Sequence, residues 1–186
     1  LESLYDEILD QTTKFLKFGN RTKAWAIAKP NSGETVIKIS IGCGSLHEPF
    51  GCSVEGIAHF LEHRLFWYDG NDVSEQFANM GIDINAFTNA LSTDFVVYGR
   101  SNDGMCAVIE KLFEIIFRPT WSIDGLDRER EIISHELALY KDDPEWVGYY
   151  TALKSAYGDE RITREIAGNR IDLNSIDLPL LKQWHR

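Results

Sequence analysis

Two histidines and a glutamate interrupt the apolar segment GIAHFLEHRLFW, residues 56–67. His59 and His63 are four residues apart, and Glu62 directly precedes the second histidine. On an α-helix, four residues advance about 6 Å and turn about 40°, so both imidazoles would project from one face. Burying such polar groups among apolar side chains is costly unless they share a partner. The fold must therefore bring a further polar group, or a metal ion, to this helix.

The order His-x-x-Glu-His reverses the His-Glu-x-x-His motif of thermolysin-type zinc peptidases and is the signature of inverted zincins. His59 and His63 form a chelating pair, and Glu62 is placed to reach a water on the metal without binding the metal itself. The alternative is two surface histidines beside a solvated glutamate. Apolar neighbours such as Phe60 and Leu65 indicate a buried motif and favour the metal site.

The segment DGLDREREIISHELALY, residues 124–140, offers a third ligand. A catalytic zinc takes three protein ligands and leaves its fourth position to water. Glu129 and Glu136 are seven residues apart and share a helix face with Ile132 and Ile133. We expect Glu136 to bind the metal and Glu129 to stand behind it as an electrostatic partner. The alternative is a charge-rich amphipathic helix with both glutamates at the edge of its apolar stripe.

Strand-like and helix-like segments alternate along the chain. Thr22–Pro30 and Thr35–Ser45 are rich in β-branched residues, and the turn-forming residues between them predict a hairpin. A second antiparallel pair is predicted at Ile82–Ala90 and Thr93–Ser101. Hairpins interleaved with helices favour an α+β fold, in which an antiparallel β-sheet packs against several α-helices.

Helices are expected between and after these strands. The motif helix should start at Ser53, a good N-cap, and stop near Gly70. Asp103 should cap a helix that ends before Pro119. The buried stripe of that helix is predicted to be Val108, Leu112, Ile115 and Ile116. The other expected helices are Val73–Met80, Asp124–Tyr140, Pro144–Tyr157 and Leu178–Arg186, with an irregular stretch before the last one.

Composition restricts the partners. The chain has 186 residues, of which 44% are hydrophobic, so one domain spanning residues 1–186 is expected. A formal net charge of −10 argues against nucleic acid or an anionic membrane as the main partner. No apolar run approaches the roughly 18 residues that cross a bilayer. Cys43, Cys52 and Cys106 lack Cys-x-x-Cys spacing and fit a reducing compartment, so a soluble, cytoplasmic protein is expected.

The motif and its neighbours resemble the active-site helix of the pitrilysin/insulinase family of zinc metallopeptidases. The resemblance covers about residues 40–168 in matching order. The segment GCGSLHEP (42–49) resembles the family's Gly-Ser-x-x-Glu strand end, and NAFT (85–88) resembles its Asn-Ala-x-Thr strand. The segment REREIISHEL (128–137) resembles its Glu-x6-Glu helix. YKDDPEW (140–146) resembles a segment in bacterial members of the processing-peptidase-like branch, including the YmfH group.

The resemblance implies a single pitrilysin-like half-domain with a Zn²⁺ cofactor and a peptide substrate. The residues that resemble the family's zinc ligands are His59, His63 and Glu136. Glu62 resembles the general base that activates a water on the zinc. Glu129 matches a glutamate that supports the metal site. Asn85 and Ala86 match an edge strand along which an extended peptide is hydrogen-bonded.

The chain departs from the family in two respects. Position 64 is often methionine or lysine in the family but is Arg64 here, and we expect this side chain to leave the metal alone. Family domains are usually longer and come in homologous pairs. We therefore expect an N-terminal catalytic domain truncated before its last strand, with a second homologous domain or subunit as its partner.

The sequence thus predicts a zinc-dependent metalloendopeptidase domain, and two other functions stay open. One is a non-catalytic subunit of the same family that holds a peptide or partner, although an intact Glu62 argues against it. The other is a structural metal domain whose site is closed by a fourth protein ligand such as His47 or His135.

Overall fold

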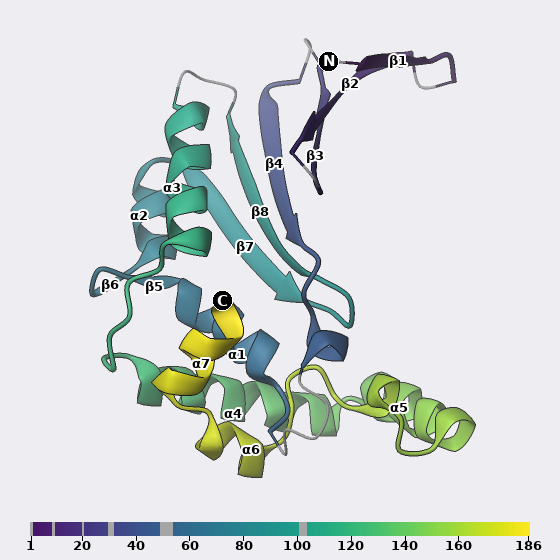
Figure 1. Ribbon diagram of the computed structural model, residues 1–186, viewed down its shortest axis with the longest axis vertical. Coiled ribbons are helices and arrows are strands. Elements are labelled where there is room, and N and C mark those ends of the chain that lie inside the picture. Colours follow the sequence, from purple (N-terminus) through teal and green to yellow (C-terminus); the bar gives the residue numbers. More distant parts are fainter. Residues whose placement is uncertain (1, 9, 20, 30–31, 49–53, 101–103) are drawn as a thin grey trace. The chain divides into compact units, whose positions relative to one another are not determined.

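The alternation of strands and helices predicted from the sequence is present in the structure, a computed structural model (Figure 1). The chain divides into two compact units, Leu1–Thr35 and Val36–Arg186. The structure describes residues 2–8, 10–19, 21–29, 32–48, 54–100 and 104–186. Cys52, and the predicted helix caps Ser53 and Asp103, lie outside the described residues.

The N-terminal unit is a three-stranded antiparallel sheet in the order β1-β2-β3. Its strands are Glu2–Asp6, Gln11–Phe18 and Thr22–Ile27. The predicted hairpin between β3 and the next strand, Glu34–Ile41, is wrong, because β3 pairs with β2 and the next strand belongs to another sheet. The connection between β2 and β3 is shorter than the one between β3 and the next strand, and Gly19 within it has a positive φ of 55°. The register places Phe15 opposite Trp25, with ring centroids 5.4 Å apart.

The second unit contains a sheet in the order β4-β8-β7, in which β7 is an edge strand. Its strands are β4 (Glu34–Ile41), β7 (Ile82–Thr88) and β8 (Thr93–Arg100). β7 and β8 pair antiparallel from Ile82↔Gly99 to Thr88↔Thr93, so the second predicted hairpin is confirmed. A short antiparallel pair of strands, β5 (Trp67–Tyr68) and β6 (Asn71–Asp72), comes between β4 and β7 in the sequence.

Most of the predicted helices of the second unit are confirmed. They are α2 (Val73–Asn79), α3 (Met105–Phe117), α4 (Leu126–Asp142), α5 (Pro144–Tyr157) and α7 (Leu178–His185). The motif helix α1 (Ile57–Leu65) is shorter than predicted at both ends, because Gly56, with a φ of 86°, is its N-cap in place of Ser53, and Trp67 already belongs to β5. A short helix, α6 (Arg170–Ser175), lies in the stretch expected to be irregular, with Asn169 as its N-cap.

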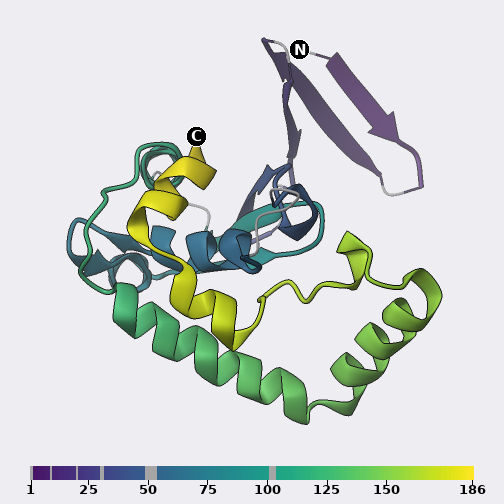
Figure 2. The same ribbon diagram turned by 60° about the horizontal axis from the view of Figure 1, so that its bottom comes forward.

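Two apolar clusters meet at α1. One joins the inner faces of β7 and β8 to α2 and α3, and it includes the predicted stripe of α3. The other joins α1 to α4, α6 and α7. Leu65 of α1 belongs to the first cluster, Ile57 and Phe60 belong to the second, and Leu61 packs against both. The motif helix therefore lies between the sheet and a layer of helices (Figures 1 and 2).

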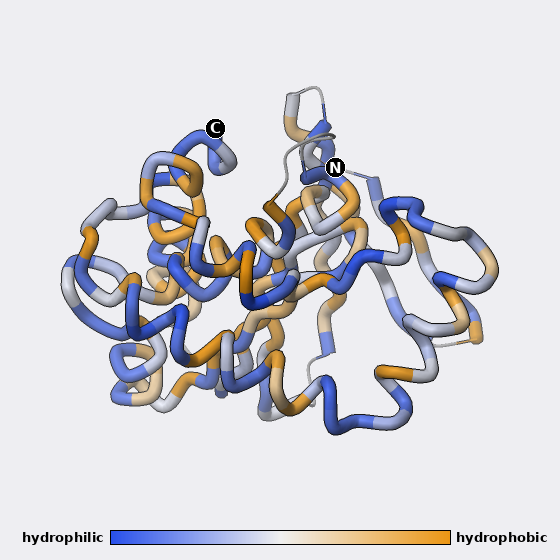
Figure 3. The backbone as a smooth tube through the Cα atoms, turned by 90° about the horizontal axis from the view of Figure 1, so that it is seen from below, coloured by the Kyte–Doolittle hydropathy of each residue, from blue (hydrophilic) through white to orange (hydrophobic). Residues whose placement is uncertain are grey.

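Hydrophilic and hydrophobic residues are mixed along the helices, as Figure 3 shows. None of the helices in the described part of the chain combines the length and hydrophobicity that crossing a membrane requires.

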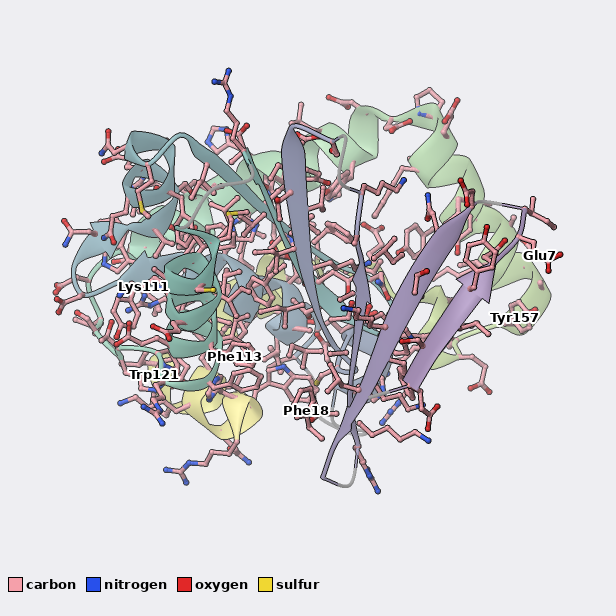
Figure 4. The ribbon with its side chains drawn as sticks, turned by 90° about the horizontal axis from the view of Figure 1, so that it is seen from above. Glu7, Phe18, Lys111, Phe113, Trp121 and Tyr157 are labelled. Atoms are coloured by element: carbon pink, nitrogen blue, oxygen red, sulfur yellow. The ribbon has the colours of Figure 1, made fainter. Side chains whose placement is uncertain are left out.

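Leu112 of α3 has no exposed surface, whereas its neighbour Phe113 is 47% exposed (Figure 4). Leu112→Ala should lower the free energy of unfolding by about 2–5 kcal/mol, because it removes buried contacts and leaves a cavity. Phe113→Ala removes more atoms but should cost about 1 kcal/mol or less. Urea unfolding followed by circular dichroism measures both losses. Equal losses would contradict this description of the core.

Candidate metal centre

The two histidines of the motif lie side by side on α1, as their spacing predicted. The ring centroids of His59 and His63 are 4.7 Å apart, and the rings meet edge to face at 80°. Both imidazoles direct Nε2 towards α4, which packs against α1. His59 is buried and His63 is partly buried, so a ligand bound between them is largely shielded from solvent.

Glu136 of α4 meets both imidazoles. Its Oε2 atom lies 3.6 Å from Nε2 of His59 and 3.5 Å from Nε2 of His63. The candidate ligand atoms of these three residues all lie within 4.8 Å of one another. Tetrahedral zinc, with bonds of about 2.0–2.1 Å, holds its ligand atoms about 3.3 Å apart. The donor set and its spacing therefore fit a zinc ion.

Glu129 lies behind His63, whereas the sequence predicted a position behind Glu136. Its Oε2 atom is 3.3 Å from Nδ1 of His63, and its side chain is buried. With the proton on Nδ1, His63 donates this hydrogen bond and leaves Nε2 free to bind a metal. Nδ1 of His59 is buried and has no hydrogen-bond partner among the described residues. Within the described residues, no hydrogen bond therefore orients the ring of His59.

Electrostatics at the site favour a cation. Burial lowers the pKa of His59 to about 4, an effect reinforced by the positive charge of His63. Burial would also lower the pKa of His63, but Glu129 and Glu136 outweigh it and raise that pKa to about 10. The hydrogen bond with His63 lowers the pKa of Glu136. Acidic side chains thus dominate the surroundings of the two imidazoles, and a divalent ion would balance their charge.

Glu62 lies on the same helix with its carboxylate held by the sheet. Its side chain is 7% exposed, and Oε2 accepts a hydrogen bond of 2.8 Å from Oγ1 of Thr88, the last residue of β7. Burial raises the pKa of Glu62, although the Thr88 hydroxyl and the charge of His63 act in the opposite direction. A carboxylate with a raised pKa is suited to accept a proton and then return it. Sequence reasoning assigned no role to Thr88.

The edge strand β7 leads to this carboxylate. Asn85 and Ala86 lie on β7 opposite Val96 and Phe95 of β8, so the other side of β7 is the edge of the sheet. The backbone N–H of Ala86 donates to Oδ1 of Asn85 at 2.9 Å. The predicted substrate-binding pair is thus placed on an edge strand that contacts α1.

The other polar residues singled out in the sequence lie elsewhere. The buried Arg64 guanidinium donates to the carbonyl oxygens of Trp67 and Ser122 at 2.6 and 2.8 Å. Nδ1 of His47 accepts a hydrogen bond from the Gly44 N–H, and His135 is exposed on α4. Within the described residues, neither histidine joins the three-residue cluster as a fourth ligand.

The arrangement can be compared with known proteins. Residues 24–170 match the family model described as insulinase (peptidase family M16). Because the match covers well over half of the chain, the chain belongs to this family of peptidases. The α+β fold is accordingly pitrilysin-like, as the sequence predicted.

Relatives and solved structures agree with this assignment. A protein named as the zinc protease YmfH of Bacillus subtilis (strain 168) is 28% identical, over 96% of this chain and 43% of its own length. The crystal structure of pitrilysin has a TM-score of 0.84 at 18% identity, over 99% of this chain and 21% of that one. A peptidase M16 inactive domain from Pseudomonas fluorescens has a TM-score of 0.79 at 18% identity, over 93% and 42%.

At 18% identity, the likeness to the two solved structures shows the fold alone. The chain spans less than half the length of the curated relatives described as zinc proteases of Bacillus subtilis, 43% of one and 38% of the other.

Glu129 and Glu131 lie on the same helix, but Glu129 is buried beside His63 and Glu131 is exposed. Glu129→Gln should weaken zinc binding by about 10–100-fold, because the neutral amide is a weaker acceptor for the hydrogen bond from Nδ1–H of His63. Glu131→Gln makes the same change of charge away from the imidazoles and should leave the affinity unchanged. Competition with a chromophoric chelator measures both, and similar losses in the two variants would contradict the role of Glu129.

Proposed function

We propose that this chain is the N-terminal catalytic domain of a zinc-dependent metalloendopeptidase. The convergence of Nε2 of His59, Nε2 of His63 and Oε2 of Glu136 carries the proposal, with Glu62 beside them. These three residues would hold the zinc. Membership of peptidase family M16 and the zinc protease names of its relatives support the same conclusion. When bound, zinc makes a water molecule more acidic and polarises a peptide carbonyl.

The side chains of this site divide the remaining tasks. Glu62 accepts a proton from the attacking water and delivers it to the departing amine, a transfer suited to its raised pKa. Thr88 holds the Glu62 carboxylate in place through its hydroxyl. Glu129 fixes the orientation of the His63 ring. Each of these roles needs a side chain locked by its neighbours, and all of them are partly or wholly buried.

The substrate in this proposal is an extended peptide that lies along β7. An edge strand offers unpaired backbone groups to which another strand can add. Asn85 and Ala86 lie on this edge, and the strand ends at Thr88, whose hydroxyl contacts Glu62. A peptide paired here would be read mainly through its backbone, so short peptides and unfolded segments are the expected substrates.

Efficient hydrolysis in this proposal requires a second homologous domain or subunit. The chain corresponds to 43% of the YmfH relative and 21% of pitrilysin, which leaves room in those proteins for a second half. We further propose a cytoplasmic location. Cys43 and Cys106 are free cysteines, as expected for a reducing compartment.

The second candidate is a non-catalytic subunit that binds a peptide without cutting it. It is favoured by the likeness to an M16 domain described as inactive. The presence of Glu62 with a hydroxyl partner in Thr88 favours the peptidase instead. A library of fluorogenic peptides separates the two candidates. A peptidase cleaves the peptides and increases the fluorescence intensity, whereas a binding subunit only raises the fluorescence anisotropy of the intact peptides.

Glu62→Gln should lower hydrolysis by about 10²–10⁴-fold, because the amide cannot take the proton from water. Zinc content should stay at about one ion per chain, because Glu62 does not belong to the ligand cluster. Peptide hydrolysis by the full-length protein and metal analysis by mass spectrometry test both statements. Glu75→Gln, on the exposed side of α2, is the matched control. Unchanged hydrolysis, or loss of zinc, in Glu62→Gln would refute the assignment.

Backbone pairing along β7 gives a separate prediction. N-methylation of one substrate amide removes a hydrogen-bond donor, so kcat/KM should fall about tenfold at positions that pair with β7. The backbone amides of the adjacent substrate residues point away from β7, so methylation there should be tolerated. A series of peptides methylated at successive residues should therefore alternate between poor and good substrates. A series without this alternation would exclude strand addition.

A further inference from the structure

The first turn of α1 is held by two carboxylates that the proposed chemistry does not use. Glu48 Oε2 accepts a hydrogen bond of 3.2 Å from the Gly56 N–H, and its Oε1 accepts one of 2.9 Å from the Ala58 N–H. Asp172 Oδ2 accepts one of 3.0 Å from the Glu55 N–H. The first N–H groups of a helix lack partners within the helix, and the N-cap Gly56 has no side chain to serve them. Glu48 supplies the missing cap from outside the helix.

The interaction is buried, and this makes it strong. The Glu48 side chain is 6% exposed, and its carboxylate faces the positive end of the α1 dipole. Hydrogen bonds to a charged acceptor in a poorly solvated place are stronger than those at the surface. Burial raises the pKa of Glu48 to about 7, against the opposing effect of the Ala58 and Gly56 N–H donors.

Backbone contacts fix the same end of the helix from a second direction. Gly56 has a φ of 86°, and a Cβ atom there would lie 2.6 Å from the carbonyl oxygen of Ala167. Gly168 has a φ of 72°, and its Cβ would lie 2.4 Å from the carbonyl oxygen of Glu55. The segment around residue 168 thus touches the start of α1 backbone to backbone. The Glu55 carboxylate adds an ion pair with Arg164 at 3.2 Å.

Glu48 also links the helix to the sheet. It follows a 3₁₀ turn, Ser45–His47, whose N–H groups at Ser45 and Leu46 donate to the carbonyl oxygens of Asn89 and Ala90. These two carbonyls belong to the turn between β7 and β8, directly after Thr88. Glu48 therefore connects the strand end that contacts Glu62 with the helix that carries it.

We propose that Glu48 is a positioning residue that sets the location of α1 along its own axis, so that His59 and His63 meet Glu136. Ala58, which donates to Glu48, directly precedes His59. A shift of α1 would change both imidazole distances to Glu136 at once, and a metal site tolerates only about 0.5 Å of error. The link to zinc rests on the proposed function, whereas the restraint on α1 does not.

The test replaces Glu48 by glutamine in the full chain. Glutamine keeps the size but offers one acceptor oxygen where two N–H groups need one each. Zinc affinity, measured by chelator competition, should weaken about tenfold. Amide exchange at Ala58, measured by NMR without metal, should accelerate about tenfold. Val108→Ala, in the core of α3, is the control: it should lower the melting temperature, leave zinc affinity unchanged and accelerate Ala58 exchange less than Glu48→Gln does.

The outcomes separate this inference from the proposed function. Glu48→Gln with unchanged zinc affinity, and a melting temperature lowered as in Val108→Ala, would reduce Glu48 to a stabilising residue and overturn the inference. Absence of zinc from the unaltered chain would refute the proposed function, and exchange at Ala58 would then decide. Exchange in Glu48→Gln that is faster than in Val108→Ala supports the inference, and exchange that is no faster overturns it. If Glu48→Gln does not fold, Glu48→Asp, which keeps the charge but shortens the reach, is judged by the same two measurements.

Discussion

The packing of α1 against α4 places two imidazoles and three carboxylates in largely buried surroundings, where each group alone would be costly. Glu136 meets both imidazoles, Glu129 meets the far nitrogen of His63, and Glu62 is held by Thr88. Apart from Nδ1 of His59, these polar groups thus have a partner or are spaced to share a cation with their neighbours. The two apolar clusters that meet at α1 keep the two helices in this relation.

The candidate ligand cluster was predictable because helix geometry converts the spacing of residues along the chain into the direction of their side chains. The four-residue step from His59 to His63 and the seven-residue step from Glu129 to Glu136 each predict a shared face, and the structure brings the two faces together. The contacts of Thr88 and Glu48 were not predictable in this way. They join a side chain to a group that is distant in sequence, and only the folded backbone determines which groups meet.

The fold shows the same division between local and tertiary information. The β7–β8 hairpin and α3 follow from patterns within about fifteen residues, and both are confirmed. The pairing of β3 with β2 was missed because residues 1–17 look polar. Both faces of that three-stranded sheet are largely exposed, and strands of this kind carry little alternation between apolar and polar residues. The end of α1 was misplaced because the β5–β6 turn begins inside the predicted helix.

Leu61 contacts both apolar clusters, so packing restrains α1 from two sides. Displacing α1 would expose apolar surface on two sides at once, at about 25 cal/mol for every square ångström. The ligand-bearing helix is therefore among the stiffest parts of the second unit. Any movement that admits a bulky ligand would have to come from elements outside these two contacts, such as helix α5, on which Tyr149 and Tyr157 are exposed.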